Sequence, residues 1–68
     1  MDNLIRELRK SRNLSQEDVA RLCDVSRQTI NAIENNKYDP TLQLAFRLAD
    51  ILKTSVDELF IYHHRKNS

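Results

Sequence analysis

The 68-residue sequence predicts a compact all-α domain of five short helices. Glycine is absent and proline occurs once, while strong helix formers such as Leu, Ala, Glu, Lys and Arg are frequent. Apolar residues recur three and four positions apart, which is the spacing of one helix face. Residues that can cap a helix N-terminus precede each predicted helix: Asn3, Ser15, Ser26, Thr41 and Ser55.

The composition limits how such a chain is stabilised. A chain of this length forms one domain, here residues 1–68, and buries only about 60% of its unfolded surface. The single cysteine excludes an internal disulfide and favours an intracellular, cytoplasmic protein. No apolar run approaches the roughly 20 residues of a membrane span, and no signal peptide is visible. Helix packing, dimerisation or both must therefore supply the stability.

The first helix is expected to run from the Asn3 cap to about Arg12, with Asn13 as a left-handed stop. The segment Ser15-Gln16-Glu17-Asp18 resembles a capping box with Asp in place of Glu. It opens a second helix of barely two turns. The buried face of this helix is expected to consist of Val19, Ala20 and Cys23.

The stretch from Ser26 to Asn35 predicts a third helix with two different faces. Ile30 and Ile33 lie three apart on an apolar face, and Arg27, Gln28 and Asn31 fall on the opposite one. A forked Arg suits the paired acceptors of guanine, and Gln or Asn suits the acceptor and donor of adenine. Taken alone, the stretch also fits an ordinary amphipathic surface helix. Two short helices joined by a tight turn, at about residues 16–35, favour a helix-turn-helix motif.

The last third of the chain predicts two more helices and a strand. Asn36 is a candidate left-handed residue, and Pro40 forces Asp39 out of helical geometry. Ser55 to Glu58 forms a full capping box before a fifth helix. The fourth helix is expected over Leu42 to about Lys53. Its apolar residues at helical spacing form the expected core stripe, which is Leu42, Ala45, Leu48, Ala49 and Leu52. Leu44, Phe46 and Ile51 fall partly outside that stripe. Phe60, Ile61 and Tyr62 are strand-prone.

With these motifs placed, the chain resembles the Cro/C1-type helix-turn-helix family, also called the xenobiotic-response-element (XRE) family. The resemblance covers roughly residues 3–60, and its most specific part is the string from Ser26 to Lys37. Within the family it is similar to small stand-alone repressors such as the cytolysin-operon repressor. The resemblance implies a lambda-repressor-like five-helix fold, and Asp24 and Asn36 stand where the family often has Gly. Other matching segments are Leu4 to Leu8, Leu14 to Glu17, Pro40 to Leu42 and Asp57 to Phe60.

The resemblance implies a transcriptional regulator, expected to be a repressor, that binds double-stranded operator DNA in the nucleoid. The expected base contacts are Arg27, Gln28 and Asn31 in the major groove. An ion pair between Arg9 and Glu34 is expected to join the first helix to the end of the third. The expected backbone contacts are Gln16, Ser26, Thr29, Asn35, Lys37 and Tyr38, with Asn13 a weaker candidate.

A symmetric homodimer is expected, because one recognition helix in one half-site gives little specificity. Residues 60–68 are the expected dimerisation segment and tail, with Phe60, Ile61 and Tyr62 pairing across the two-fold axis as an antiparallel ribbon. In the alternative, Phe60 and Tyr62 fold back on their own core and dimers form only on DNA.

Other function classes fit the sequence less well. There is no Gly-rich loop or nucleophile pattern of an enzyme, and no cofactor is expected. His63 and His64 are adjacent rather than spaced as a helical ligand pair, so no metal is expected, and Cys23 is interpreted as a core residue rather than a redox sensor. A module that binds a protein partner is the remaining alternative, although it would not need the forked polar set on the third helix.

Overall fold

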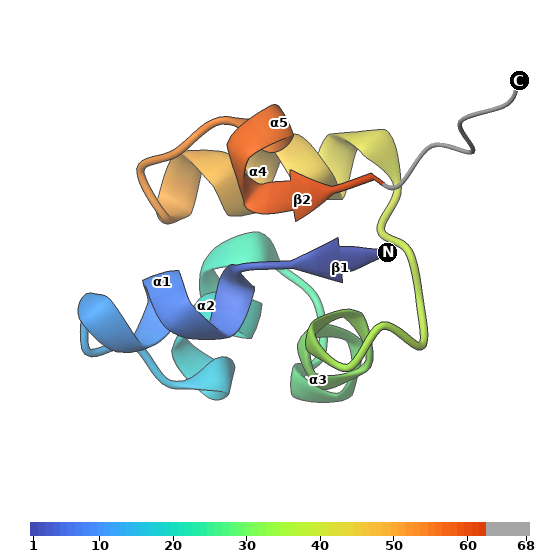
Figure 1. Cartoon of the computed structure of the whole chain (residues 1–68). Coiled ribbons are helices and arrows are strands. Elements are labelled where there is room, and N and C mark those ends of the chain that lie inside the picture. The colour runs from blue at the N-terminus through green and yellow to red at the C-terminus, as the bar shows by residue number, and fades with distance from the viewer. Residues whose placement is uncertain (63–68) are drawn as a thin grey trace, which may run out of the picture.

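The computed structural model describes residues 1–62, which form five helices and a small antiparallel sheet (Figure 1). This confirms the predicted all-α fold with a short C-terminal strand. No helix of residues 1–62 is long and apolar enough to cross a membrane. The elements in chain order are β1 (Asp2–Asn3), α1 (Ile5–Ser11), α2 (Gln16–Cys23), α3 (Arg27–Glu34), α4 (Leu42–Ile51), α5 (Val56–Leu59) and β2 (Phe60–Ile61).

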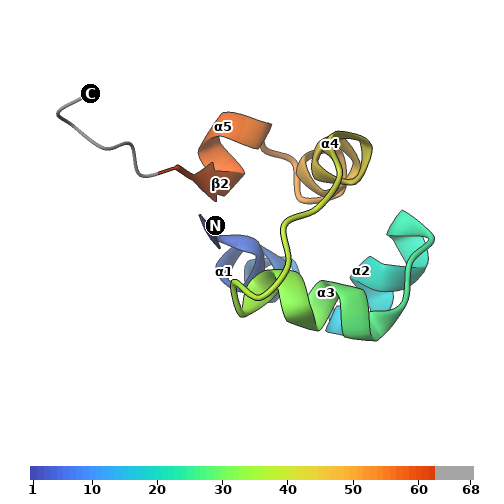
Figure 2. The ribbon, with the colours of Figure 1, turned by 90° about the vertical axis from the view of Figure 1, so that its right-hand side faces the viewer.

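The elements lie in two groups, with α1, α2 and α3 on one side and α4, α5 and β2 on the other (Figures 1 and 2). The connection between α3 and α4 passes from one group to the other. The sheet links the groups, because Asp2 pairs with Ile61 and Asn3 with Phe60. Both ends of the described chain therefore meet on one side of the molecule.

The pairing of β2 with β1 corrects the sequence-based view of the C-terminal segment. The strand was predicted, but its partner is β1 of the same chain rather than a second copy. Phe60 is buried in the core of its own chain with 8% of its surface exposed, so it is not part of a free apolar trio. Ile61 and Tyr62 remain exposed. The alternative of folding back on the core is thus right for Phe60 and wrong for Tyr62.

Local hydrogen bonds begin three of the helices as predicted. Ser15 Oγ accepts from the Asp18 amide and Ser15 N donates to Asp18 Oδ2, each at 2.9 Å, which completes the capping box. Ser26 and Thr41 each accept from the amide three residues on. Asn3 Oδ1 accepts from Ile5 N at 3.1 Å, although Leu4 occupies the formal cap position.

The capping box predicted for α5 is wrong. Ser55 Oγ donates to the carboxylate of Glu58 at 3.1 Å instead of accepting from its backbone amide. The helix covers only four residues, Val56–Leu59, before the chain turns extended at Phe60 to pair with β1. Strand pairing at its C-terminal end leaves α5 a single turn, and the Glu58 amide donates to the Ser55 carbonyl at 3.2 Å rather than to the Ser55 hydroxyl.

The core lies between the two groups of helices. The predicted buried face of α2 is confirmed, as are Ile30 and Ile33 of α3. On α4, however, Leu42 is 71% exposed and Leu44 is buried, the reverse of the prediction. The buried stripe of α4 is turned toward Leu44 and Ala45, and Leu42 projects from the open first turn. The full core comprises Ile5, Val19, Ala20, Cys23, Ile30, Ile33, Leu44, Ala45, Leu48, Ala49, Leu52, Leu59 and Phe60.

Four residues adopt the left-handed conformation that glycine usually provides. Asn13 and Asn36 were predicted to do so, with φ angles of 58° and 61°, and Asp24, which stands where the family often has glycine, has a φ of 60°. Lys53, after α4, was not predicted and has a φ of 59°. A left-handed non-glycine residue costs roughly 1–2 kcal/mol, so the absence of glycine lowers the stability of this domain.

Replacing Lys53 with glycine is expected to raise the free energy of unfolding by about 1 kcal/mol, because the side chain no longer opposes the left-handed backbone. Denaturant unfolding followed by circular dichroism measures the change. The matched control is Lys10→Gly inside α1, which should lower stability by about 1 kcal/mol. A loss of stability in both variants would contradict the assigned strain at Lys53.

Candidate nucleic-acid interface

The helix α3 is anchored on one face and open on the other. Ile30 and Ile33 are essentially fully buried, whereas Arg27, Gln28 and Asn31 are exposed. The Ser26 cap sets the start of the helix, so Arg27 and Gln28 occupy its first turn. The predicted division of α3 into a buried and a solvent-facing side is therefore present.

A hollow of about 330 Å³ opens beside the N-terminal half of α3. It is lined by Arg27, Gln28 and Asn31 of α3 and by Gln16 at the start of α2. The two helices thus bring together residues that are 11 to 15 positions apart in the sequence. None of the four side chains is acidic, and each offers hydrogen-bond donors.

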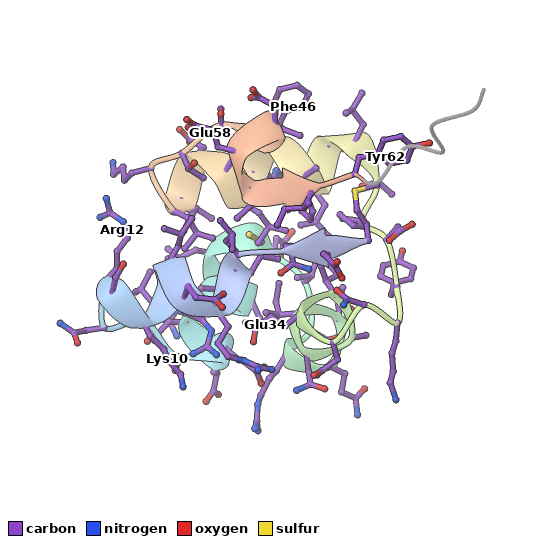
Figure 3. The ribbon with its side chains drawn as sticks, viewed as in Figure 1. Lys10, Arg12, Glu34, Phe46, Glu58 and Tyr62 are labelled. Carbon is purple, nitrogen blue, oxygen red and sulfur yellow. The ribbon has the colours of Figure 1, made fainter. Side chains whose placement is uncertain are left out.

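Glu34 is the polar centre behind this hollow. Its carboxylate has no exposed surface and accepts from Arg9 Nε at 2.8 Å and Arg9 Nη2 at 3.2 Å. The predicted ion pair is therefore present and two-pronged. Figure 3 shows Glu34 in the space between α1 and α3. Arg9 also donates to the Leu14 carbonyl at 3.1 Å, which ties the α1–α2 connection to the same pair.

Two further donors reach the same carboxylate. Gln16 Nε2 donates to Glu34 Oε1 at 3.1 Å, and Arg6 Nε lies 3.5 Å from that oxygen. Sequence reasoning missed Arg6, although its spacing of three from Arg9 places both on one side of α1. Burial by itself would raise the pKa of Glu34, but the hydrogen bonds from Arg9 and Gln16 and the charges of Arg9 and Arg6 outweigh it and lower the pKa.

The predicted backbone-contact residues differ in their surroundings. Ser26 Oγ and Thr29 Oγ1 bond to each other at 2.9 Å within the cap, and Asn35 Nδ2 donates to the Asn31 carbonyl at 2.8 Å. Lys37 and Tyr38 are exposed on the connection after α3. Tyr38 lines a separate hollow of about 280 Å³, which does not include the base-contact set.

The metal and thiol predictions bear on different parts of the chain. Residues 1–62 contain no group of three His, Cys, Asp or Glu side chains placed to hold a metal ion. His63 and His64 lie outside the described residues. Cys23 is buried, and burial raises the pKa of its thiol despite the nearby charge of Arg47. Its position agrees with the core interpretation.

The helix-turn-helix family model matches residues 5–59. The chain belongs to the helix-turn-helix family. An HTH-type transcriptional regulator of Methanocaldococcus jannaschii is 48% identical over 62 residues, covering 91% of this chain and 94% of that protein. This membership confirms the resemblance to the Cro/C1-type (XRE) family, whereas the narrower likeness to the cytolysin-operon repressor stays a prediction.

Solved structures of helix-turn-helix proteins have the same fold. The restriction-modification controller protein C.AhdI of Aeromonas hydrophila has a TM-score of 0.76 and 34% identity, covering 82% of this chain and 85% of that one. The N-terminal DNA binding domain of SinR from Bacillus subtilis also has a TM-score of 0.76, with 26% identity and 90% of each chain covered. The protein is therefore a transcriptional regulator with a helix-turn-helix DNA-binding domain.

Removing Arg9 alone is expected to be more damaging than removing the whole ion pair. Arg9→Met leaves the buried carboxylate of Glu34 without its main partner, which should cost about 3–5 kcal/mol. The double variant Arg9→Met/Glu34→Met buries no charge and should be more stable than the single variant. Urea unfolding of the three proteins measures this, and a double variant less stable than Arg9→Met would contradict the assigned burial.

Acidification should weaken the wild type through the same pair. The pKa of Glu34 is lowered in the folded chain, so its ionised form adds stability above the ordinary pKa of a glutamate. That stability is lost as the pH falls through the lowered pKa. As the pH falls from neutral to acidic, the melting temperature of the wild type should drop further than that of the Arg9→Met/Glu34→Met variant. An equal drop in the two proteins would contradict this prediction.

Proposed function

We propose that this protein binds operator DNA as a homodimer, with α3 of each copy in the major groove, and acts as a repressor. The observation that carries the proposal is the hollow that Gln16, Arg27, Gln28 and Asn31 share at the exposed side of α3. A major groove accepts one helix, and a helix-turn-helix reads bases from the N-terminal part of its second helix. Occupying a promoter is sufficient for repression.

The side chains divide into two roles by chemistry and position. Arg27 matches the two acceptors of a guanine edge, and Gln28 and Asn31 match the acceptor and donor of adenine. Lys37, exposed after the C-terminal end of α3, carries a charge suited to a phosphate. Gln16, Ser26, Thr29, Asn35 and Tyr38 are the other proposed backbone contacts. Phosphate contacts hold the helix in register, and base contacts choose the sequence.

The proposed dimer surface is apolar and lies away from α3. Leu42 and Phe46 are one turn apart on α4, with 71% and 59% of their surfaces exposed, and Tyr62 is 65% exposed. Figure 3 shows Phe46 and Tyr62 on the side of the molecule opposite to α3. A two-fold dimer through this surface leaves both α3 helices free to enter grooves about 34 Å apart. Ile61, 39% exposed, adds to its edge.

The dependence of binding on salt separates this function from a protein-binding module. Binding to duplex DNA through phosphates weakens steeply as salt rises, because the protein displaces condensed counterions. Retention on duplex DNA that falls with salt supports the proposal. Absent or salt-independent retention would favour a protein partner instead.

Arg27→Ala and Lys37→Ala should fail in different ways. Arg27→Ala is expected to relax sequence choice at one base pair per half-site, at a cost of roughly 1–3 kcal/mol there. Lys37→Ala should weaken all sequences about equally and reduce the slope of log affinity against log salt by about one unit per site. Selection of bound sites from random duplexes, followed by salt titration, measures both. Wild-type site preference in Arg27→Ala would remove it from the base readers.

Phe46→Glu is expected to convert the free dimer to a monomer, because two carboxylates would meet across the two-fold axis. Sedimentation at micromolar concentration measures the change. The matched control is Leu22→Glu on α2, at a side chain 55% exposed and outside the proposed surface, which should leave the dimer intact. Dimers that persist in Phe46→Glu would place the interface elsewhere.

A further inference from the structure

Five side chains beside the hollow form a closed ring of polar contacts. The ring begins and ends at the buried carboxylate of Glu34 and passes through three side-chain amides. Gln16 Nε2 donates to Glu34 Oε1 (3.1 Å), Asn31 Nδ2 to Gln16 Oε1 (3.4 Å), Asn35 Nδ2 to Asn31 Oδ1 (3.3 Å) and Arg6 Nη2 to Asn35 Oδ1 (3.4 Å), while Arg6 Nε lies 3.5 Å from Glu34 Oε1.

The chemistry of the two charged members sets the direction of the ring. An ionised carboxylate only accepts hydrogen bonds and a guanidinium only donates them. Each amide between them has one accepting and one donating end and, alone, fits its place in either orientation. Because Glu34 accepts from Gln16, the oxygen of Gln16 must face Asn31. Asn31 must then donate, and the same reasoning continues to Asn35 and Arg6.

The ring therefore decides which side of Asn31 is the donor. Its nitrogen faces Gln16 of α2, and its oxygen faces Asn35 at the end of α3. Asn31 is exposed and lines the hollow, and its amide keeps one N–H and one lone pair beyond the ring contacts. An adenine edge presents an acceptor and a donor in a fixed order. An amide held in one orientation matches that order in only one way.

We propose that Glu34 is a positioning residue for base recognition, which acts through Gln16 to hold Asn31 in the one amide orientation that reads its base pair. The inference rests on the proposed function, because it requires α3 to lie in the major groove. It adds a second role to Glu34, beyond joining α1 to α3. The Glu34 side chain has no exposed surface with which to contact DNA directly.

Two variants break the ring at different points. Glu34→Gln keeps the size of the side chain but can donate as well as accept, so the direction of the ring is then imposed by Arg6 alone and is held less firmly. Gln16→Met removes the link between Glu34 and Asn31 and leaves the Arg9–Glu34 pair in place. This second variant keeps the test informative if Glu34→Gln does not fold. Glu17→Gln is the matched control, because it removes an exposed carboxylate beside Gln16 without touching the ring.

The experiment is the selection of bound sites from random duplexes by wild type and each variant. Asn31→Ala identifies the base pair that Asn31 reads, and Arg27→Ala identifies a second one. We expect Glu34→Gln and Gln16→Met to lower discrimination at the Asn31 base pair by about three- to tenfold, which is less than the complete loss of one good amide–base pair. In these two variants, discrimination at the Arg27 base pair should stay as in wild type. In the control Glu17→Gln, discrimination at both base pairs should stay as in wild type.

A second readout uses the free protein. In wild type, the side-chain N–H NMR signals of Asn31 should lie away from those of an exposed asparagine, and the proton that is bonded to Gln16 should exchange slowly. In Gln16→Met these signals should move to the positions of an exposed asparagine. In Glu34→Gln they should shift in the same direction, because Gln16 is held less firmly; a role of Glu34 in stability alone would leave the Asn31 signals of that variant unchanged.

Three results would overturn the inference. The first is a folded Glu34→Gln or Gln16→Met protein with wild-type preference at the Asn31 base pair. The second is an equal loss of affinity for all sequences in Glu34→Gln, which assigns Glu34 a stabilising role only. The third is an Asn31→Ala protein with unchanged site choice, which would show that Asn31 reads no base. The proposed function would then still be supported by base recognition through Arg27. A wild-type protein without any sequence preference would instead overturn the proposed function and this inference together.

Discussion

The buried carboxylate of Glu34 is the constraint on which the arrangement of this domain depends. A charge with no exposed surface requires partners, and here Arg6 and Arg9 of α1 and Gln16 of α2 reach the carboxylate from the two neighbouring helices. Arg9 also holds the α1–α2 connection through the Leu14 carbonyl. One residue at the end of α3 therefore fixes that helix against both of its neighbours. The position of Arg27 and Gln28 follows from this constraint, because they share a rigid helix with Glu34.

The small size of the domain explains why its periphery is built from local hydrogen bonds and strained turns. With 68 residues the core is limited, so each helix end must satisfy its own backbone groups. Ser15, Ser26 and Thr41 do this within three residues, and the left-handed residues end helices without any glycine. The sheet between β1 and β2 adds a contact between segments far apart in the sequence. It ties the two helix groups together beyond their shared core.

Most local features of the fold could be predicted from the sequence, although the Ser55 box was wrong; of the long-range contacts, the family resemblance gave only the Arg9–Glu34 pair. The Ser15 box and the Ser26 cap depend on residues three apart, and their patterns are visible in the chain. The β1–β2 pairing joins residues almost sixty positions apart, and nothing around Asp2 indicates a strand. The wrong assignment of Leu42 to the core in place of Leu44 has a similar cause. Both residues fit a helical stripe, and only the packing of α4 against the rest of the chain determines which one is buried. At the site, the residue types indicated Arg27 and Asn31 as base contacts. The ring of hydrogen bonds joins side chains from three helices, so only the structure could reveal it.

A buried ionic network is a weak source of stability, because desolvation of its charges offsets most of their attraction. A domain this small would gain as much from apolar residues of similar volume. The network provides something that apolar residues cannot. Its charged groups determine which end of each neighbouring amide donates a hydrogen bond and which end accepts one. Within residues 1–62 the fully buried carboxylate of Glu34 lies behind the polar hollow of α3, not in the apolar core near α4. Because of that placement, the buried carboxylate that holds the helices together also orients the side chains that are proposed to read DNA.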